Sequence, residues 1–247
     1  MAGTIIVVPC FNEAQRLSAE EFWQFAHQWR DGTFLFIDDG STDDTPRILS
    51  ALVESAPGKF EVLRLPRNSG KGEAIRQGML RAFQSNPEYV GYWDADLATP
   101  LDAIPMFAQV FRDRPVTEIV LGARVKLLGR DIQRRPLRHY LGRVFATAVA
   151  VNLGMKIYDS QCGAKLFRVT ERVRAVFETP FLSRWIFDVE ILARFMKLEK
   201  PDLPPSLETS LYELPVPVWH DVAGSKLRVK DFVRAAYDLV RIHRSMQ

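Results

Sequence analysis

The sequence predicts an α/β fold with a mostly parallel central sheet flanked by helices. Short apolar runs alternate with longer segments of helical spacing through the first half of the chain. Polar motifs rich in Asp, Asn, Gly and Ser follow the apolar runs, as expected where parallel strands end beside a ligand site. With 247 residues, 47% of them hydrophobic, the chain is long enough to build one domain with a substantial core.

The predicted strands are short runs rich in β-branched and aromatic residues, a composition typical of buried parallel strands. They cover residues 4–9, 33–38, 60–65, 89–93 and 118–123. Helices are predicted between them over residues 18–31, 44–56, 71–85 and 101–112, and Ser18 with Glu21 has the spacing of a capping box. After residue 125 we expect a basic segment, a long helix over 136–153, and a mixed region that ends in a helix over 227–244.

Basic residues are concentrated in one segment, although the whole chain carries a net charge of only +3. Between residues 124 and 143 there are seven Lys and Arg residues and one acid, Asp131. Such a block is either a solvated face, a phosphate-binding site, or a surface attracted to anionic membrane lipids. In the same way, residues 144–155 form either a buried core helix or an interfacial one. We expect no nucleic-acid partner.

Cysteine content and hydropathy indicate the environment of the chain. The two cysteines, Cys10 and Cys162, are too few for a disulfide framework, which favours a reducing compartment. The N-terminus lacks the basic region of a signal peptide, and the longest apolar stretch, VFATAVAVNLGM, is shorter than the roughly 20 residues that span a bilayer. We therefore expect a cytoplasmic protein without a transmembrane helix, soluble or peripheral on the cytoplasmic face of a membrane.

Four polar motifs are predicted at the edge of the sheet where the strands end: PCFNE, DDGSTDD, RNSGKGEA and DADLATP. In the second motif, Asp43 or Asp44 would cap the next helix, whereas Asp39 and Ser41 would hydrogen bond to a nucleoside. In the third, glycines flank Lys71 at a helix start, which is either a plain loop or a diphosphate site built from backbone N–H groups and a cation.

The fourth motif carries two carboxylates, Asp94 and Asp96, directly after a buried strand. They form either a solvated turn or a site for Mg²⁺ or Mn²⁺, because hard cations take carboxylate oxygens and keep positions open for substrate phosphates. A cation held there would neutralise charge on a departing nucleoside diphosphate.

Two further motifs lie in the second half of the chain. In DSQCGAKLF, Lys165 is the stronger candidate for facing a phosphate, because Cys162 has no histidine or second cysteine close by. In RWIFDVE, Asp188 and Glu190 either pack at the edge of the core or supply a carboxylate that reaches a sugar or acts as a base.

Taken in order, these motifs resemble those of family 2 glycosyltransferases, which have the Rossmann-like GT-A fold. The resemblance extends over about residues 4–228 and includes GSKL at 224–227. Within the family, the sequence is most similar to polyprenyl-phosphate sugar transferases, and in particular to dolichyl-phosphate β-glucosyltransferases. The pair QCGAKLF and RWIFDVE is the most specific part of the match.

The resemblance implies roles for individual residues within one catalytic domain, 1–247, whose donor half is 1–124 and whose acceptor half is 125–247. The donor-binding residues would be Pro9, Asn12, Glu13, Asp39, Ser41, Lys71 and Asp94. The metal would bind to Asp94 and Asp96, which with Asp188 are the expected catalytic residues. The acceptor phosphate would contact Arg124, Arg138, Lys165 and Lys226. Ala98 and Gly142 stand where mannosyl relatives have a metal-binding glutamine and a phosphate-binding serine.

The leading hypothesis is an inverting, metal-dependent glycosyltransferase that moves a hexose, glucose from UDP-glucose, to a polyprenyl phosphate of the dolichyl type. A phosphate monoester is already largely ionised at neutral pH, so Asp188 would position the acceptor rather than deprotonate it. One alternative is a soluble hydroxyl acceptor, for which Asp188 or Glu190 would act as general base. A non-catalytic nucleotide-sugar-binding module is another alternative.

Overall fold

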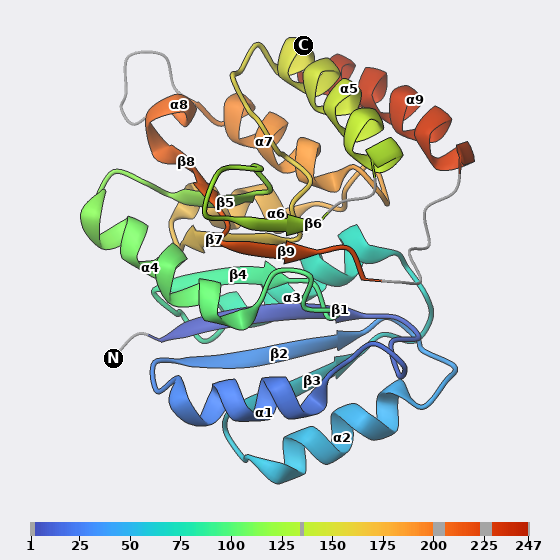
Figure 1. Cartoon of the computed structure of the whole chain (residues 1–247), viewed down its shortest axis with the longest axis vertical. Helices are drawn as coiled ribbons and strands as arrows, with labels where there is room; N and C mark the ends of the chain where they lie inside the picture. Colours follow the sequence, from blue (N-terminus) through green and yellow to red (C-terminus); the bar gives the residue numbers. More distant parts are fainter. Residues whose placement is uncertain (1–2, 134–135, 200–205, 223–228, 247) are drawn as a thin grey trace.

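A computed structural model describes residues 3–133, 136–199, 206–222 and 229–246 of the chain (Figure 1). Within these residues the centre of the molecule is a seven-stranded sheet with the order β3-β2-β1-β4-β7-β5-β8. Its strands are β1 (Thr4–Cys10), β2 (Gly32–Asp38), β3 (Phe60–Arg64), β4 (Tyr89–Trp93), β5 (Ile119–Ala123), β7 (Ala164–Arg168) and β8 (Leu211–Pro215). The predicted mostly parallel sheet is confirmed, because β7 alone among these strands runs antiparallel to its neighbours.

The helices of the first half match the predicted segments closely. They are α1 (Ala19–Gln28), α2 (Thr45–Ser55), α3 (Lys71–Phe83), and α4 (Ile104–Asp113), which a short 3₁₀ turn (Leu101–Ala103) precedes. The Oγ of Ser18 accepts a hydrogen bond from the Glu21 amide at 3.3 Å, which confirms Ser18 as the cap of α1. At α2 it is Asp43 that accepts from the Thr45 amide, at 3.0 Å.

The second half adds helices around the same sheet and a two-stranded sheet beside it. These helices are α5 (Pro136–Leu153), α6 (Glu171–Glu178), α7 (Phe187–Lys197), α8 (Leu207–Ser210) and α9 (Val229–Met246). The small sheet pairs β6 (Asp131–Gln133) with β9 (Val218–His220) in parallel. In Figure 1, α5 and α9 lie together at the top of the view, above α7.

Hydrophobic side chains fill the space on both faces of the sheet. On β1, Val7 belongs to one cluster, while Ile6 and Val8 belong to the other, as the alternation of side chains along a strand requires. Helices α3, α5, α6, α7 and α9 cover the first cluster, and α1, α2 and α4 cover the second. Because both faces are covered, β1, β2 and β4 carry apolar residues at consecutive positions rather than in strict alternation.

For residues 144–155 we considered either a buried core helix or an interfacial one. Helix α5 has one buried side and one exposed side. Val149 and Leu153 are buried against the core, whereas Val144 and Val151 are 70% and 77% exposed. The helix is therefore a core element on one side and presents apolar groups to the surface on the other. No helix among the described residues is long and apolar enough to cross a membrane.

The register of the strands brings the polar motifs to one edge. Cys10 pairs with Asp38, Asp38 pairs with Arg64, and Val7 pairs with Tyr92, so β1, β2, β3 and β4 end close to one another. The loops that carry PCFNE, DDGSTDD, RNSGKGEA and DADLATP therefore start from the same edge, as predicted.

Candidate active site

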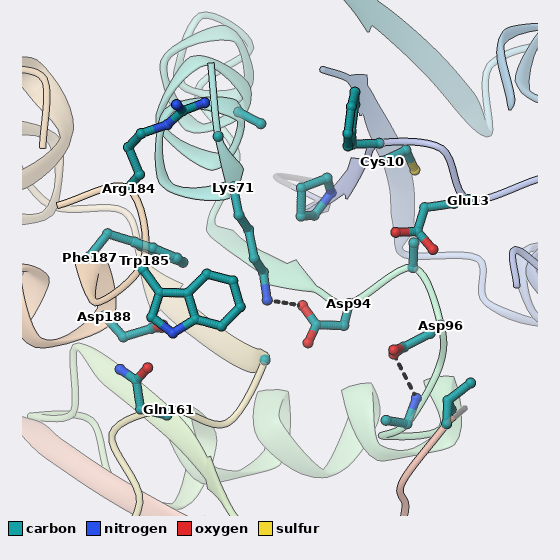
Figure 2. A pocket seen from close by; sticks show the side chains of 18 of the residues that line it. Cys10, Glu13, Lys71, Asp94, Asp96, Gln161, Arg184, Trp185, Phe187 and Asp188 are labelled. Carbon is teal, nitrogen blue, oxygen red and sulfur yellow. Dashed lines mark hydrogen bonds and ion pairs between the residues drawn. The ribbon is translucent and has the colours of Figure 1, made fainter. Parts of the chain in front are cut away.

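A pocket of about 560 Å³ opens at this edge of the sheet. Its walls come from the loops after β1, β2 and β4, from the start of α3, and from the segment around the start of α7 (Figure 2). A volume of this size is within the range of small-molecule sites, roughly 300–1,000 Å³. Residues from both halves of the chain therefore surround one cavity.

Asp94 lies at the centre of the pocket and faces Lys71 (Figure 2). The ammonium of Lys71 is 2.5 Å from Oδ1 of Asp94. Burial by itself would lower the pKa of Lys71, but the charges of Asp94 and Asp188 outweigh it and raise that pKa. On the other side, Gly163 touches the carboxylate so closely that a Cβ there would lie 1.9 Å from Oδ2. Only glycine fits at position 163 while Asp94 keeps this orientation.

Asp96 is the second carboxylate of the motif and also lines the pocket. Burial, with the charge of Asp94, raises its pKa, and Nη1 of Arg16 is 3.6 Å from its Oδ2. Leu97, the next residue, has a left-handed backbone with φ of 52°, a conformation that costs a non-glycine residue roughly 1–2 kcal/mol. Strain of this kind is concentrated at functional sites.

The two carboxylates fit a divalent cation by their donor chemistry. Asp94 and Asp96 are crowded together, and each is next to a cationic side chain, Lys71 or Arg16. Across the residues that the structure covers, no group of three or more His, Cys, Asp or Glu side chains is arranged to hold a metal. The protein would thus supply two carboxylates, and a ligand's phosphate oxygens or water would complete the coordination, as is usual for Mg²⁺.

Asp188, at the start of α7, reaches the pocket from the opposite side to Asp96 (Figure 2). Its Oδ1 accepts hydrogen bonds from the Lys165 ammonium at 2.6 Å and from the Tyr92 hydroxyl. Burial, reinforced by Asp188, raises the pKa of Tyr92 well above its usual value, so Tyr92 stays a donor. Two fixed donors on one oxygen hold Asp188 in place.

Lys165, which we expected to face a phosphate, is directed to partners within the protein. Its side chain is 0% exposed, and its ammonium donates to the Cys162 carbonyl at 2.7 Å as well as to Asp188. A buried ammonium needs such partners, because an unpaired buried charge is costly. Lys165 therefore acts on the pocket through Asp188.

Glu190 is likewise a structural carboxylate rather than a pocket residue. It is 2% exposed, accepts from the Leu182 amide at 2.8 Å, and pairs with Arg194 at 2.7 Å. These contacts hold the segment before α7 and leave the hypothesis of Glu190 as a base without support.

The predicted donor loop divides into residues that line the pocket and residues that hold the loops. Pro9 and Glu13 line the pocket. Asn12 has φ of 51°, and its Oδ1 accepts from the Thr42 amide at 2.8 Å. Ser41 is buried, and its Oγ accepts from the Asn12 amide at 3.0 Å. In this conformation, the hydrogen bonds of Asn12 and Ser41 connect the loop after β1 to the loop after β2.

Asp39 orients the start of α3. Its carboxylate accepts from the Ser69 and Gly70 amides at 2.7 and 2.8 Å, and it lines the pocket. Burial raises its pKa, although these two hydrogen bonds act in the opposite direction. Gly70 has φ of 97°, which favours glycine and turns the chain into the helix at Lys71.

Arg124, directly after β5, also lines the pocket. Its Nε and Nη2 donate to the two oxygens of Asp159 at 2.6 and 2.7 Å, a bidentate pair. Burial would lower the pKa of Arg124, but Asp159 outweighs it and raises that pKa. Of the other predicted phosphate ligands, Arg138 lies on α5 with its side chain outside the described part, and Lys226 lies outside the described residues.

Sequence reasoning missed several residues of the pocket wall, among them Arg16, Gln161, Arg184 and Trp185. Arg184 donates to Oδ1 of Asn68 at 2.9 Å and so joins the segment before α7 to the loop before α3. The indole of Trp185 is 39% exposed and lies between Lys71 and Gln161 in Figure 2. All four lie inside or beside the motifs quoted above, and this position in the sequence is the signal that could have identified them.

Replacing Gly163 with alanine tests whether the Asp94 carboxylate must keep its position. We expect Gly163→Ala to weaken binding of Mn²⁺ with a nucleoside diphosphate about 10- to 100-fold, the usual effect of disturbing the support of a metal ligand. Isothermal titration calorimetry measures this affinity. The matched control is Gly122→Ala, whose Cβ would meet Sγ of Cys162 at 2.9 Å and would crowd the same region away from Asp94. Equal affinities in both variants would contradict this assignment.

Comparison with known proteins identifies the relatives of this chain. Residues 5–172 match the model of glycosyl transferase family 2. The chain is 30% identical to a dolichyl-phosphate beta-glucosyltransferase of Trichomonas vaginalis, over 97% of this chain and 70% of the relative. It is 32% identical to the enzymes of that name from Dictyostelium discoideum, over 96% and 72%, and from Homo sapiens, over 90% and 68%.

Solved structures with the same fold include glucosyl-3-phosphoglycerate synthase of Mycobacterium tuberculosis. Its complex with Mn²⁺, uridine diphosphate and glucosyl-3-phosphoglycerate superposes with a TM-score of 0.67 at 17% identity, covering 99% of this chain and 80% of the other. This likeness confirms the predicted GT-A fold, and the family match adds the activity class. The chain belongs to glycosyl transferase family 2 and is a glycosyltransferase.

Proposed function

We propose that this glycosyltransferase moves glucose from UDP-glucose to the phosphate of a dolichyl-type polyprenyl lipid, with inversion at the sugar carbon. The observation that carries the proposal is one pocket with two poles. Asp94, Asp96 and Lys71 form the first pole, and Arg124 with Asp188, which line the same pocket, form the second. The names of the relatives support the lipid phosphate as the acceptor.

The first pole suits a nucleoside diphosphate. Lys71 is the first residue of α3, where free backbone N–H groups and the helix dipole favour phosphate. Asp94 and Asp96 would hold Mg²⁺ or Mn²⁺, and that cation would neutralise the negative charge that develops on the leaving diphosphate. The solved relatives were crystallised with Mn²⁺ or Mg²⁺ and uridine diphosphate, which supports this choice of donor and cation.

The acceptor at the second pole would arrive already as an anion. A phosphate oxygen of the lipid would attack C1 of the sugar, forming the O–C1 bond as the bond from C1 to the diphosphate oxygen breaks. The attacking oxygen needs no strong base, because the monoester is ionised near neutral pH. Asp188, fixed by Lys165 and Tyr92, would orient the reacting groups.

Transfer of labelled glucose from UDP-glucose to a short-chain polyprenyl phosphate, recovered by organic extraction, tests the reaction. We expect Asp96→Ala to abolish transfer and to weaken UDP binding only when Mg²⁺ or Mn²⁺ is present, because the carboxylate acts through the cation. The control is Asp102→Ala, an exposed carboxylate in the 3₁₀ turn after the same motif. Metal-stimulated activity in Asp96→Ala would refute the metal role. Transfer to a soluble hydroxyl compound alone would refute the lipid acceptor.

The variant Asp188→Asn separates a positioning carboxylate from a general base. We expect kcat to fall by less than about 100-fold with polyprenyl phosphate, and the loss to stay constant between pH 6 and 9, since base catalysis is worth roughly 10²–10⁴-fold. Tyr92→Phe is the matched control, since it removes the other partner of Oδ1 without changing a charge. Thermal unfolding of both variants is measured in parallel, because the neutral asparagine side chain leaves the Lys165 ammonium without its counter-charge. A larger, pH-dependent loss would favour a hydroxyl acceptor.

We also propose that the protein contacts the surface of an anionic membrane without crossing it. The loop between β5 and β6 exposes Leu127 by 50% and Leu128 completely, between Lys126 and Arg130. Apolar groups flanked by cations are typical of elements that insert shallowly into an anionic lipid surface. The basic residues Arg134 and Arg135 that follow lie outside the described residues.

We expect weak, salt-sensitive flotation of the protein with anionic liposomes and little with neutral ones, because each basic residue contributes on the order of 1 kcal/mol and salt screens it. Leu128→Asp should reduce flotation. Val116→Asp should not, because this valine is 59% exposed near the opposite end of β5. Equal flotation with both liposome types would contradict electrostatic docking.

A further inference from the structure

One wall of the pocket is formed by residues 182–186, directly before α7, and we call them the wall segment. Arg184, Trp185 and Ile186 of this segment line the pocket, and Asp188 follows in the first turn of α7 (Figure 2). The wall segment contains no helix or strand, so no ladder of backbone hydrogen bonds holds it. The position of Asp188 therefore depends on the side chains that bind this segment.

Ser183 is the buried residue of the wall segment around which its hydrogen bonds are arranged. Its Oγ accepts from the Trp185 and Ile186 amides at 3.2 and 3.0 Å. The same hydroxyl donates to Oδ2 of Asp238 at 2.7 Å. Because a hydroxyl has one hydrogen to donate and two lone pairs to accept with, these three bonds use its full capacity. The Ser183 hydroxyl thus joins the backbone of the wall segment to the Asp238 side chain.

Asp238 belongs to helix α9, 55 residues further along the chain than Ser183. It is buried, and Nη1 of Arg241 is 3.6 Å from its Oδ1. Helix α9 packs against α7, and Leu239 and Ile242 of α9 belong to the core cluster on that face of the sheet. The core therefore fixes the place of the Asp238 carboxylate. A hydrogen bond to an ionised acceptor is stronger than one between neutral groups.

The two ends of the wall segment are held by different carboxylates. Glu190 of α7 accepts from the Leu182 and Ser183 amides, at 2.8 and 3.3 Å, and so holds the beginning of the segment. The Trp185 and Ile186 amides, at its end, are bound by the Ser183 hydroxyl, which Asp238 orients. The part of the segment that is nearest to the start of α7 thus depends on a side chain of α9.

We propose that Ser183 and Asp238 are positioning residues for glycosyl transfer, because their hydrogen bond lets α9 hold the wall segment and, through it, Asp188. This rests on the proposed function, in which Asp188 orients the reacting groups. Ser183 and Asp238 are not among the residues that line the pocket, so both act through their neighbours. Displacement of a reacting group by about 1 Å can cost roughly 100-fold in rate, which makes such indirect support important.

The test compares kcat for transfer to a short-chain polyprenyl phosphate with the affinity for UDP and Mn²⁺ measured by calorimetry. Ser183→Ala and Asp238→Leu should each lower kcat about 10- to 100-fold and leave the UDP affinity within about threefold of the wild type, because alignment and not donor binding is lost. The double variant should be no slower than the slower single one, because both changes break the same bond. Asp238→Asn keeps an oxygen that accepts from Ser183 and should restore most of kcat. The matched control is Ser245→Ala, whose hydroxyl donates to the Ile242 carbonyl within α9.

Thermal unfolding is measured for every variant, and kcat is determined well below the melting temperature, so that only folded protein is compared. A lower melting temperature with wild-type kcat in Ser183→Ala would overturn the proposal, because the hydroxyl would then serve stability alone. An equal loss of kcat in Asp238→Asn and Asp238→Leu would overturn the role of the hydrogen bond. If Asp238→Leu does not fold, the smaller changes Ser183→Ala and Asp238→Asn decide the question.

Amide hydrogen exchange separates failure of this proposal from failure of the proposed function. The peptide 182–190 should exchange about fivefold faster in Ser183→Ala than in the wild type and in Asp238→Asn, as expected when one hydrogen bond is lost. Equal exchange in all three proteins would refute the positioning role even if the wild type transfers glucose. No transfer by the wild type, together with the expected exchange, would refute the proposed function and leave the link between α9 and the wall segment intact.

Discussion

The buried ion pair between Lys165 and Asp188 is the contact on which the arrangement of the pocket depends. Lys165 belongs to β7, the antiparallel strand between β4 and β5, and Asp188 begins α7. Because the ammonium of Lys165 is fully buried, the fold must supply a carboxylate beside it. An unpaired charge at this position would cost several kcal/mol. Tyr92 of β4 donates to the same oxygen. One oxygen of Asp188 therefore joins the sheet of the first half to the helices of the second.

Crowding of negative charge is the second constraint on the site. Asp94 and Asp96 stand one residue apart at the end of β4, and burial with the charge of Asp94 raises the pKa of Asp96. Lys71 and Arg16 offset this charge. In the proposed function, the same cations would meet the diphosphate once a divalent ion binds to the carboxylates. The two carboxylates and the two cations offset one another's charge in the structure without a ligand.

Hydrogen bonds between side chains and backbone help to hold the loops around the pocket. Asp39 holds the turn before α3, Asn12 with Ser41 joins the loops after β1 and β2, and Glu190 holds the segment before α7. Residues of this kind share motif positions with ligand-binding residues, because both keep the loop geometry that binding requires. A motif residue can therefore be essential without touching a ligand.

The sequence by itself determined the α/β class, the first five strands and their helices, and the gathering of four motifs at one sheet edge. Strand and helix periodicity and the shared edge of parallel strands are local or topological properties. Only the tertiary structure decided that β7 enters the sheet antiparallel, that Lys165 is buried, and that Arg16, Arg184 and Trp185 line the pocket. The residues around Lys165 in the sequence would be the same whether its ammonium contacted a phosphate or a buried carboxylate. Its partner is Asp188, which lies 23 residues further along the chain. The two side chains come together only when the chain folds.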